Sequence, residues 1–301
     1  MIPAAFARGT LEREGESAKL WLAELPAIVE GLLSRWECSV DGAVTHGRVG
    51  VIVPVRCAAG SAVIKVSFPH PGNLHEPDAL AAWGGGGAVL LHEREDELFA
   101  MLLERVHPAT LADAADAARV AGQLSRRLAI PAPAGLPRLQ DRADEWDEQL
   151  RKDAFELEHR LPASALDAAL AVIDELGRDQ PDTVIHGDLH PNNILRADRE
   201  PWLAVDPKGW VGDPAYDGAT FLRPRALALI ESDDLVKALH HELEVFAEAA
   251  ELDPARLRLW AHLRAVQDAF HGRRHGFGVA RQGPLLDRLI AVVDHLAVSW
   301  R

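Results

Sequence analysis

The stretch Val184-Ile-His-Gly-Asp-Leu-His-Pro-Asn-Asn-Ile-Leu195 decides the fold and the class of chemistry that this chain supports. Eleven residues after Leu195 comes Asp206, in the run Trp202-Leu-Ala-Val-Asp-Pro-Lys208. Two short apolar runs therefore deliver the carboxylates of Asp188 and Asp206, and the amide of Asn193 follows the first of them by five residues. Phosphoryl transfer needs these parts, namely a base that orients a hydroxyl and oxygen ligands that hold magnesium on a nucleotide.

Length and composition set outer bounds on the function. The 301 residues are 48% hydrophobic and 26% charged, which is ordinary for a globular protein of one or two domains. The formal net charge of -14 argues against a nucleic-acid binder, whose surface would be basic. It is compatible with a cationic or neutral acceptor, although a solvated acidic surface accounts for most of it.

Cysteine usage and hydrophobicity predict a cytoplasmic protein that does not enter a membrane. The two cysteines, Cys38 and Cys57, form neither a disulfide framework nor a metal site, so each is expected to fill a small apolar position. No apolar run approaches the roughly 18 residues of a membrane span. The N-terminal residues Met1-Ile-Pro-Ala-Ala-Phe-Ala-Arg8 carry charge too early for a signal peptide.

The first third of the chain is expected to combine helix with a small antiparallel sheet. Apolar residues recur at helical spacing over residues 10–36, where Pro26 predicts a kink or a fresh helix start. The β-branched runs 49–56 and 61–68 indicate a hairpin. A short helix, a glycine turn and two further strands are expected at residues 76–83, 84–87, 88–92 and 98–103.

Helical patterns dominate after residue 108, and no internal repeat is present. The expected helices cover residues 110–128, 139–161, 163–176, 233–250, 254–271 and 284–298. The chain is therefore predicted to be α+β, with a small sheet-containing N-terminal lobe over residues 1–105 and a larger helical C-terminal lobe over residues 106–301.

Lys65 is the first candidate in the N-terminal lobe because it interrupts the apolar run Ala62-Val-Ile-Lys-Val66. A charge at such a position must be paired or must face a cleft, unless the strand simply turns it outward. Glu76 on the next predicted helix offers a partner, with Asp78 as an alternative. In kinases a strand lysine holds the α- and β-phosphates and a helix glutamate holds that lysine.

Asp188, Asn193 and Asp206 are the catalytic and metal-binding candidates. Each is an ordinary turn residue when taken alone, but their joint spacing beside apolar runs is typical of kinases. Asp188 would accept the hydroxyl proton, while Asn193 and Asp206 would supply oxygens to Mg²⁺. His186 and His190 lack further ligands at metal-binding spacing, so they are expected to pack in the loop.

The run His186-Gly-Asp-Leu-His-Pro-Asn-Asn193 resembles the catalytic loop of the aminoglycoside phosphotransferase family, small-molecule relatives of protein kinases. The run Val205-Asp-Pro-Lys-Gly-Trp-Val-Gly-Asp-Pro-Ala-Tyr-Asp217 is similar to the branch that contains streptomycin 6-phosphotransferase and hydroxyurea phosphotransferase. The resemblance extends from about Trp36 to Ala219.

This resemblance implies a two-lobed protein-kinase-like fold that binds ATP in a cleft, with GTP as an alternative donor. It assigns Asp188 as the catalytic aspartate, Asn193 and Asp206 as magnesium ligands and Lys65 as the phosphate-binding lysine. The hinge that pairs with the purine would contain Glu104, Arg105 and Val106. The chain departs from the family's pattern at Val44-Thr-His-Gly47, in the nucleotide loop, and at Lys208-Gly-Trp210.

An acceptor with amino or guanidinium groups would need carboxylates on the helical lobe. The candidates for contact with the acceptor are Asp217, Asp268, Lys208 and Trp210. Asp217 has a second interpretation, which is to brace the fold at the end of its motif. Glu231–Asp234 are better explained as the capped, acidic start of a helix.

The expected function is ATP-dependent phosphorylation of a hydroxyl on an antibiotic, with streptomycin-like aminoglycosides or hydroxyurea as first acceptors. A kinase for a housekeeping sugar or amino alcohol uses the same parts, and a nucleotide-binding pseudokinase is a third interpretation. A small, cationic acceptor is the expected partner, with neither nucleic acid nor membrane involved. The sequence leaves the oligomeric state unknown.

Overall fold

The computed structural model describes residues 2–58, 60–229, 234–277 and 280–300, and the chain forms two compact units. The first unit comprises Met1–Ala109 and Leu195–Lys208, and the second comprises Thr110–Ile194 and Gly209–Arg301. The chain therefore enters the first unit twice. The expected lobes were contiguous in sequence, whereas the segment that carries Asp206 packs with the first unit.

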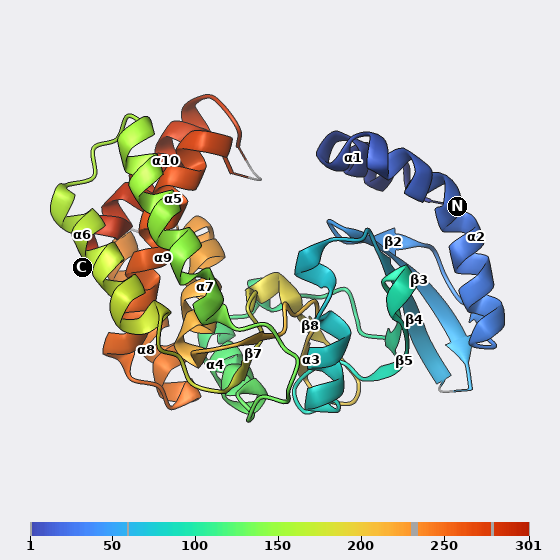
Figure 1. Ribbon diagram of the computed structural model, residues 1–301. Helices are drawn as coiled ribbons and strands as arrows, with labels where there is room; N and C mark the ends of the chain where they lie inside the picture. Colours follow the sequence, from blue (N-terminus) through green and yellow to red (C-terminus); the bar gives the residue numbers. More distant parts are fainter. Residues whose placement is uncertain (1, 59, 230–233, 278–279, 301) are drawn as a thin grey trace. The chain divides into compact units, whose positions relative to one another are not determined.

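An antiparallel sheet forms the centre of the first unit (Figure 1). The strands follow the order β1-β3-β4-β6-β5, and β2 pairs with β3. Their bounds are β1 (Ser39–Val40), β2 (Thr45–His46), β3 (Gly50–Cys57), β4 (Gly60–Ser67), β5 (Leu91–Glu95) and β6 (Ala100–Glu104). The expected hairpin is confirmed, because β3 and β4 pair antiparallel with Ile52 opposite Lys65.

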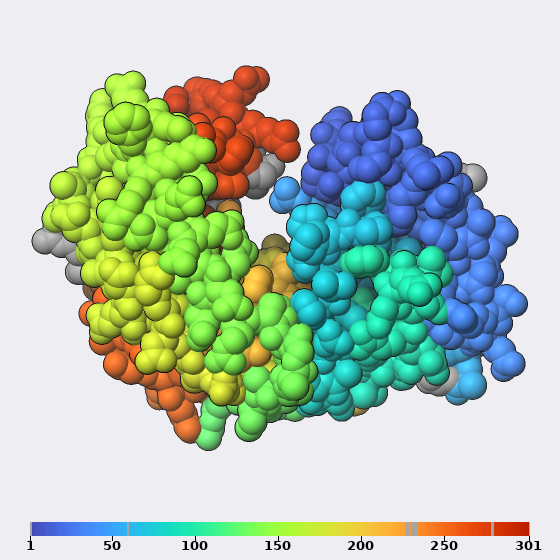
Figure 2. All heavy atoms as spheres, viewed as in Figure 1, coloured from blue at the N-terminus to red at the C-terminus, as the bar shows by residue number. Residues whose placement is uncertain are grey.

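Two N-terminal helices, α1 (Ala4–Glu14) and α2 (Glu16–Arg35), cover apolar side chains of this sheet. In the space-filling view their side chains form one continuous surface of the first unit (Figure 2, dark blue). Pro26 does not start a fresh helix, since α2 continues through it. The break falls instead at Gly15, whose φ of +65° lies in the left-handed region. Cys38 and Cys57 pack against the same core and form no disulfide.

The glycine run at residues 84–87 separates helix α3 (Glu76–Trp83) from strands β5 and β6 of the sheet. The expected helix is confirmed, and Gly84 ends it with a left-handed φ of +54°. The expected strand at 88–92 begins later, at Leu91, and the next begins at Ala100 rather than residue 98. The reason is that Ala88 forms an isolated bridge with Ala204 and so leaves the path of β5.

Helices make up most of the second unit. They are α4 (Ala117–Leu128), α5 (Ala143–Glu156), α6 (Ala163–Val172), α7 (Pro214–Ala228), α8 (Leu235–Ala250), α9 (Pro254–His275) and α10 (Pro284–Ser299). Helix α4 packs on α8, and α9 packs on α7 and α10 (Figure 1). Gly122 permits the α4–α8 approach, because a Cβ there would lie 2.5 Å from the carbonyl oxygen of Phe246.

Helix α7 is absent from the sequence expectation. Its hydrophobic and polar residues do not segregate to two faces, and Pro224 lies inside it, so neither periodicity nor composition marks it as helical. The expected helix 110–128 is shorter, since a 3₁₀ turn at Leu111–Asp113 precedes α4. None of the helices in the described ranges is both long and apolar enough to cross a membrane.

Two short antiparallel strand pairs carry the chemistry-bearing loops. Strand β7 (Val184–Ile185) pairs with β10 (Trp210–Val211) and leads directly into the loop of Asp188. Strand β8 (Ile194–Arg196) pairs with β9 (Trp202–Ala204), which leads into Asp206. Each carboxylate therefore follows the end of a short buried strand, as its position after an apolar run indicates.

Candidate active site

Lys65, Glu76 and Asp206 form one cluster within the first unit. The ammonium Nζ of Lys65 donates to Glu76 Oε1 at 2.6 Å and Oε2 at 2.7 Å. It also donates to Asp206 Oδ1 at 2.7 Å. Lys65 comes from strand β4 and Glu76 from the first turn of α3. Asp206 comes from the loop that follows β9. One ammonium therefore joins two carboxylates from segments far apart in the sequence.

Burial and charge act in opposite directions on this cluster. Lys65 and Glu76 are 7% and 1% exposed. Burial alone would lower the pKa of Lys65, but the carboxylates of Asp206 and Glu76 outweigh it and hold that pKa above its ordinary value. Burial raises the pKa of Glu76, and the lysine opposes this without cancelling it. Because two carboxylates share one ammonium, the cluster carries a surplus of negative charge that suits a divalent cation.

The backbone of Asp206 is in an unusual conformation for a residue with a side chain. Its φ of +59° lies in the left-handed region that favours glycine, and its side chain remains one-third exposed. Such positions cost free energy and persist where surrounding contacts fix them, as the bond to Lys65 does here. Lys208, two residues after Asp206, also belongs to the first unit. Its positive charge opposes the rise that burial causes in the pKa of Glu76.

In the second unit, Asp217 fixes the loop that presents Asp188. The carboxylate of Asp217 is 1% exposed and accepts the backbone N–H groups of His186 and Gly187, each at 2.8 Å. Gly187 has a φ of +79°, which is why glycine precedes the aspartate. Burial raises the pKa of Asp217 to about 7, although the two backbone donors oppose that rise. This geometry supports the bracing interpretation of Asp217 over contact with an acceptor.

Asn193 lies in the same loop and is tied to it. Its Nδ2 donates to the backbone carbonyl oxygen of Asp188 at 3.0 Å, so its amide oxygen is the atom that suits a metal. The carboxylate of Asp206 in the first unit is the other candidate ligand, and both are hard oxygen donors of the kind that Mg²⁺ binds. Each of the two residues by itself therefore offers the kind of oxygen donor that the predicted metal would need.

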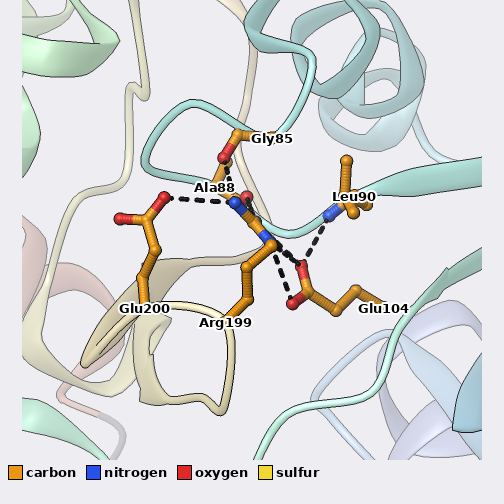
Figure 3. A network of polar contacts seen from close by, with 6 residues as sticks. All are labelled: Gly85, Ala88, Leu90, Glu104, Arg199 and Glu200. Carbon is orange, nitrogen blue, oxygen red and sulfur yellow. Dashed lines mark hydrogen bonds and ion pairs between the residues drawn. The ribbon is translucent and has the colours of Figure 1, made fainter.

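The proposed hinge segment begins with a glutamate whose side chain is fully engaged (Figure 3). Glu104 accepts the backbone N–H of Leu90 at 3.1 Å and the guanidinium of Arg199 at 2.9 Å. Arg199 also donates to the carbonyl oxygens of Gly85 and Ala88, each at 2.8 Å. The glycine run is thus anchored from the β8–β9 turn by the bonds to Gly85 and Ala88.

The next two hinge candidates are half-buried. Arg105 lies 3.3 Å from the carboxylate of Asp41 and also donates to the carbonyl oxygen of Asp41 at 3.2 Å. Val106 continues the chain beyond β6. Only the main-chain groups of this segment are therefore candidates for pairing with a purine.

Asp268 lines a cavity of the second unit together with Asp188. It is 7% exposed, and Arg223 Nε lies 3.1 Å from its Oδ2. Its charge is therefore already compensated by an arginine. Trp210 is not among the residues that line this cavity; it pairs with Ile185, and the guanidinium of Arg142 lies 5.8 Å from its ring.

The acidic segment before α8 is only partly described. Asp234 accepts the backbone N–H of Lys237 at 3.0 Å and so caps α8, whereas the sequence favoured Ser232 or Asp233 as the cap. Glu231, Ser232 and Asp233 lie outside the described residues.

Sequence reasoning missed three polar residues that organise the two units. Arg199 bonds Gly85, Ala88, Glu104 and Glu200 within the first unit, as Figure 3 shows. Asp213 is 2% exposed and accepts from Arg256 Nε and Trp260 Nε1, each at 2.6 Å. Arg264 lines the cavity beside Asp188. A charged residue among apolar neighbours on a helix is the only signal that Arg264 gives in the sequence, and many surface arginines share it.

The two loop histidines lie against backbone and carboxylate groups. His186 is fully buried, and its Nδ1 accepts the backbone N–H of Asp188 at 3.2 Å. His190 Nε2 lies 4.0 Å from Asp188 Oδ1. Across the described ranges, no group of three or more His, Cys, Asp or Glu side chains is arranged to hold a metal.

Comparison with known proteins agrees with the geometry. The model of the family described as aminoglycoside/hydroxyurea antibiotic resistance kinase matches residues 35–276. Streptomycin 6-kinase of Streptomyces glaucescens is 34% identical over 274 residues, covering 89% of each chain. Hydroxyurea phosphotransferase of Kitasatospora aureofaciens is 31% identical, covering 89% of this chain and 78% of that protein.

A solved structure extends the comparison to the fold. Choline kinase LicA of Streptococcus pneumoniae superposes with a TM-score of 0.57 at 14% identity, covering 92% of this chain and 99% of that one. The α+β, protein-kinase-like fold is therefore established. The chain is a small-molecule phosphotransferase and belongs to the aminoglycoside/hydroxyurea antibiotic resistance kinase family.

Proposed function

We propose that this protein transfers the γ-phosphoryl group of ATP to a hydroxyl of a small antibiotic or antibiotic-like molecule, with Mg²⁺ as the resident metal. Relatives named for streptomycin and for hydroxyurea support this acceptor class, and these two compounds are the first to test. Family membership leaves the acceptor open between a polycation and a small neutral molecule.

The observation that carries the proposal is the cluster of Lys65, Glu76 and Asp206. A lysine held between a helix glutamate and a second carboxylate is the arrangement that kinases use to bind phosphates beside a metal. Lys65 would neutralise the α- and β-phosphate oxygens, and Glu76 would keep the ammonium in position. Asp206 would bind Mg²⁺ together with Asn193, and the metal would neutralise charge on the transferred group.

Asp188 is the proposed catalytic base. It would accept a hydrogen bond from the acceptor hydroxyl and align that oxygen with the γ-phosphorus. A bond forms between this oxygen and phosphorus while the bond to the β–γ bridging oxygen breaks, and ADP leaves. The hydroxyl proton passes to Asp188. The Asp217 brace keeps the loop in place throughout.

We assign a separate role to each of the two lobes that the sequence predicts. Residues 1–105 would bind the nucleotide, with the main chain of Glu104, Arg105 and Val106 pairing with the purine. Residues 106–301 would bind the acceptor and carry Asp188. The segment of Asp206 is the exception, since it follows β9 and packs with the nucleotide-binding unit.

A coupled ADP-release assay with streptomycin and hydroxyurea, followed by mass spectrometry, tests the proposal. One added phosphate on an acceptor, dependent on ATP and Mg²⁺, is the expected result. The Asp188→Asn variant should bind nucleotide normally and release acceptor-dependent ADP about 10² to 10⁴ times more slowly. Phosphorylation of a sugar or amino alcohol, with no product from a broad antibiotic panel, would instead support a housekeeping metabolite kinase. Mg²⁺-dependent ATP binding with no phosphorylated product from any of these acceptors would support a pseudokinase.

A further inference from the structure

The cavity beside Asp188 has mostly apolar walls. Its volume is about 250 Å³, and it lies within the second unit. Since a cavity of about 150 Å³ holds a benzene-sized molecule, there is room for an apolar ring or chain. The principal apolar side chains come from α7, α9, α10 and the residue that ends α10: Leu222, Ala261, Leu289, Val293, Leu296 and Trp300.

The described charged residues of this wall offer no surplus of carboxylates. Aside from His190, they are Asp188, Asp268, Arg223 and Arg264. Arg223 pairs with Asp268 at 3.1 Å, so this carboxylate is compensated before any acceptor arrives. A polycationic acceptor needs an excess of negative charge around its amino or guanidinium groups. Because two arginines face two aspartates in this wall, its described residues carry no such excess of negative charge.

Two buried donors in the same wall have no hydrogen-bond partner among the described residues. They are Arg264 Nε and the indole Nε1 of Trp300, whose residue is 4% exposed. Both groups can only donate, and a buried donor without an acceptor is unfavourable. Each of these two atoms exposes less than 1 Å² of surface, so an acceptor oxygen of a ligand would reach it only if the side chain moved. The outer nitrogens of the Arg264 guanidinium are therefore the part of this residue that is placed to bind a ligand oxygen.

Arg264 is held close to Asp188 without a carboxylate of its own. Its Nη1 makes long bonds to Tyr216 Oη at 3.4 Å and Gln267 Oε1 at 3.3 Å, and its guanidinium lies 5.6 Å from the Tyr216 ring centroid. No carboxylate in the described ranges lies within ion-pair distance of it. A fixed arginine of this kind recognises carboxylate or carbonyl oxygens.

A second cavity shares charged residues with the first and is lined by more positive than negative side chains. Its volume is about 460 Å³, and it shares Arg223, Arg264 and Asp268 with the first. Its described lining contains five arginine or lysine side chains against three carboxylates. A cationic surplus here contrasts with the net charge of -14 for the whole chain.

We propose that the acceptor is a neutral or anionic hydroxyl compound with an apolar ring or chain and exposed oxygen acceptors, and not a polycation. Its hydroxyl lies at Asp188, its apolar part in the 250 Å³ cavity and an oxygen acceptor on Arg264. Arg264 is thereby a specificity-determining residue. The inference rests on the proposed kinase function for the position of the hydroxyl, while the preference for a charge class is a statement about binding.

Binding and turnover together test the inference on the full-length protein. Calorimetry in the presence of Mg²⁺ and a non-hydrolysable ATP analogue compares streptomycin, phenyl β-glucoside and 3-phenyllactate. We expect the last two to bind about tenfold or more tightly than streptomycin. Equal or tighter binding of streptomycin overturns the inference, as does failure of both other probes to bind at millimolar concentration.

Variants separate the contribution of Arg264 from a loss of folding. Arg264→Gln should reduce the preference over streptomycin by about tenfold, and Arg264→Lys should restore part of it. Arg151→Gln removes an exposed arginine of α5 that lines neither cavity and should leave the preference unchanged. An unaltered preference in Arg264→Gln overturns the inference. Acceptors that bind as expected but gain no phosphate would refute the kinase proposal while sparing the charge preference.

Discussion

Lys65 Nζ lies 2.7 Å from Asp206 Oδ1, although 141 residues separate them along the chain. This bond joins the β3–β4 hairpin to Leu195–Lys208, the segment that returns to the first unit after the loop of Asp188. The same ammonium satisfies the buried carboxylate of Glu76. Lys65 therefore contributes to the stability of its own unit, separately from the nucleotide-binding role proposed for it.

Replacing Lys65 by Met should lower the free energy of unfolding by about 3 kcal/mol, because Glu76 and Asp206 lose the charge that compensates them. The loss should shrink at acidic pH, where Glu76, whose pKa is already raised, becomes protonated. Urea denaturation at two pH values measures both effects. Lys152→Met, at an exposed position on α5, is the control and should change stability little. A Lys65→Met protein as stable as the control would contradict this account of the cluster.

Asp188→Asn should reduce the acceptor-dependent rate by about 10² to 10⁴, the range expected for a positioned general base. Affinity for the nucleotide should remain that of the wild type, since Asp188 lies in the second unit and Lys65 in the first. Single-turnover kinetics and nucleotide titration measure the two quantities. Near-normal turnover in this variant would exclude Asp188 as the base.

Asp217 should make stability depend on pH in a defined direction. Its folded pKa of about 7 lies above the ordinary value near 3.9, so its contribution is full below pH 4 and is lost as pH rises toward 7. The stability of the wild type minus that of Asp217→Asn should therefore fall by more than about 1 kcal/mol between pH 4 and pH 8. Urea denaturation across this range gives the difference. A constant or rising difference would refute the raised pKa, and the exposed Asp167→Asn controls for net charge.

Gly187→Ala should destabilise the protein by about 1 to 2 kcal/mol and lower its turnover, because a φ of +79° is unfavourable for a residue with a Cβ. The matched control is Gly31→Ala in α2, where a Cβ would meet no atom within 4 Å. That change should stabilise the helix by up to about 1 kcal/mol. Thermal unfolding and the ADP-release assay distinguish the pair. Equal effects at the two positions would show that the loop conformation is not strained.

Short-range patterns carry most of what the sequence could predict. The β3–β4 hairpin and α3 follow from residue types and spacing, and so does the pairing of Lys65 with Glu76, because these elements are close in the chain. Helix α7 could not be predicted, because its polar and apolar residues do not segregate to two faces and Pro224 lies inside it. The helical conformation of this segment therefore depends on tertiary packing and not on local propensity.

The site was predictable in its residue types but not in its partners. The bracing role of Asp217 depends on two backbone N–H groups 30 and 31 residues away, which no local rule connects. Asp268 was chosen for its charge, and its compensation by Arg223 depends on how α7 packs against α9. Arg264 and Arg199 gain their importance only from contacts that arise on folding.

The return of Leu195–Lys208 to the first unit has a consequence for how this protein can be divided. A gene fragment ending after Ala109 would encode the hairpin and α3 but would lack Asp206, Arg199 and strand β9. Two-fragment complementation at that point would leave one carboxylate of the lysine cluster on the wrong polypeptide. A fragment that keeps all three residues of the lysine cluster must therefore extend at least to Asp206, and it carries with it residues 110–194 of the second unit.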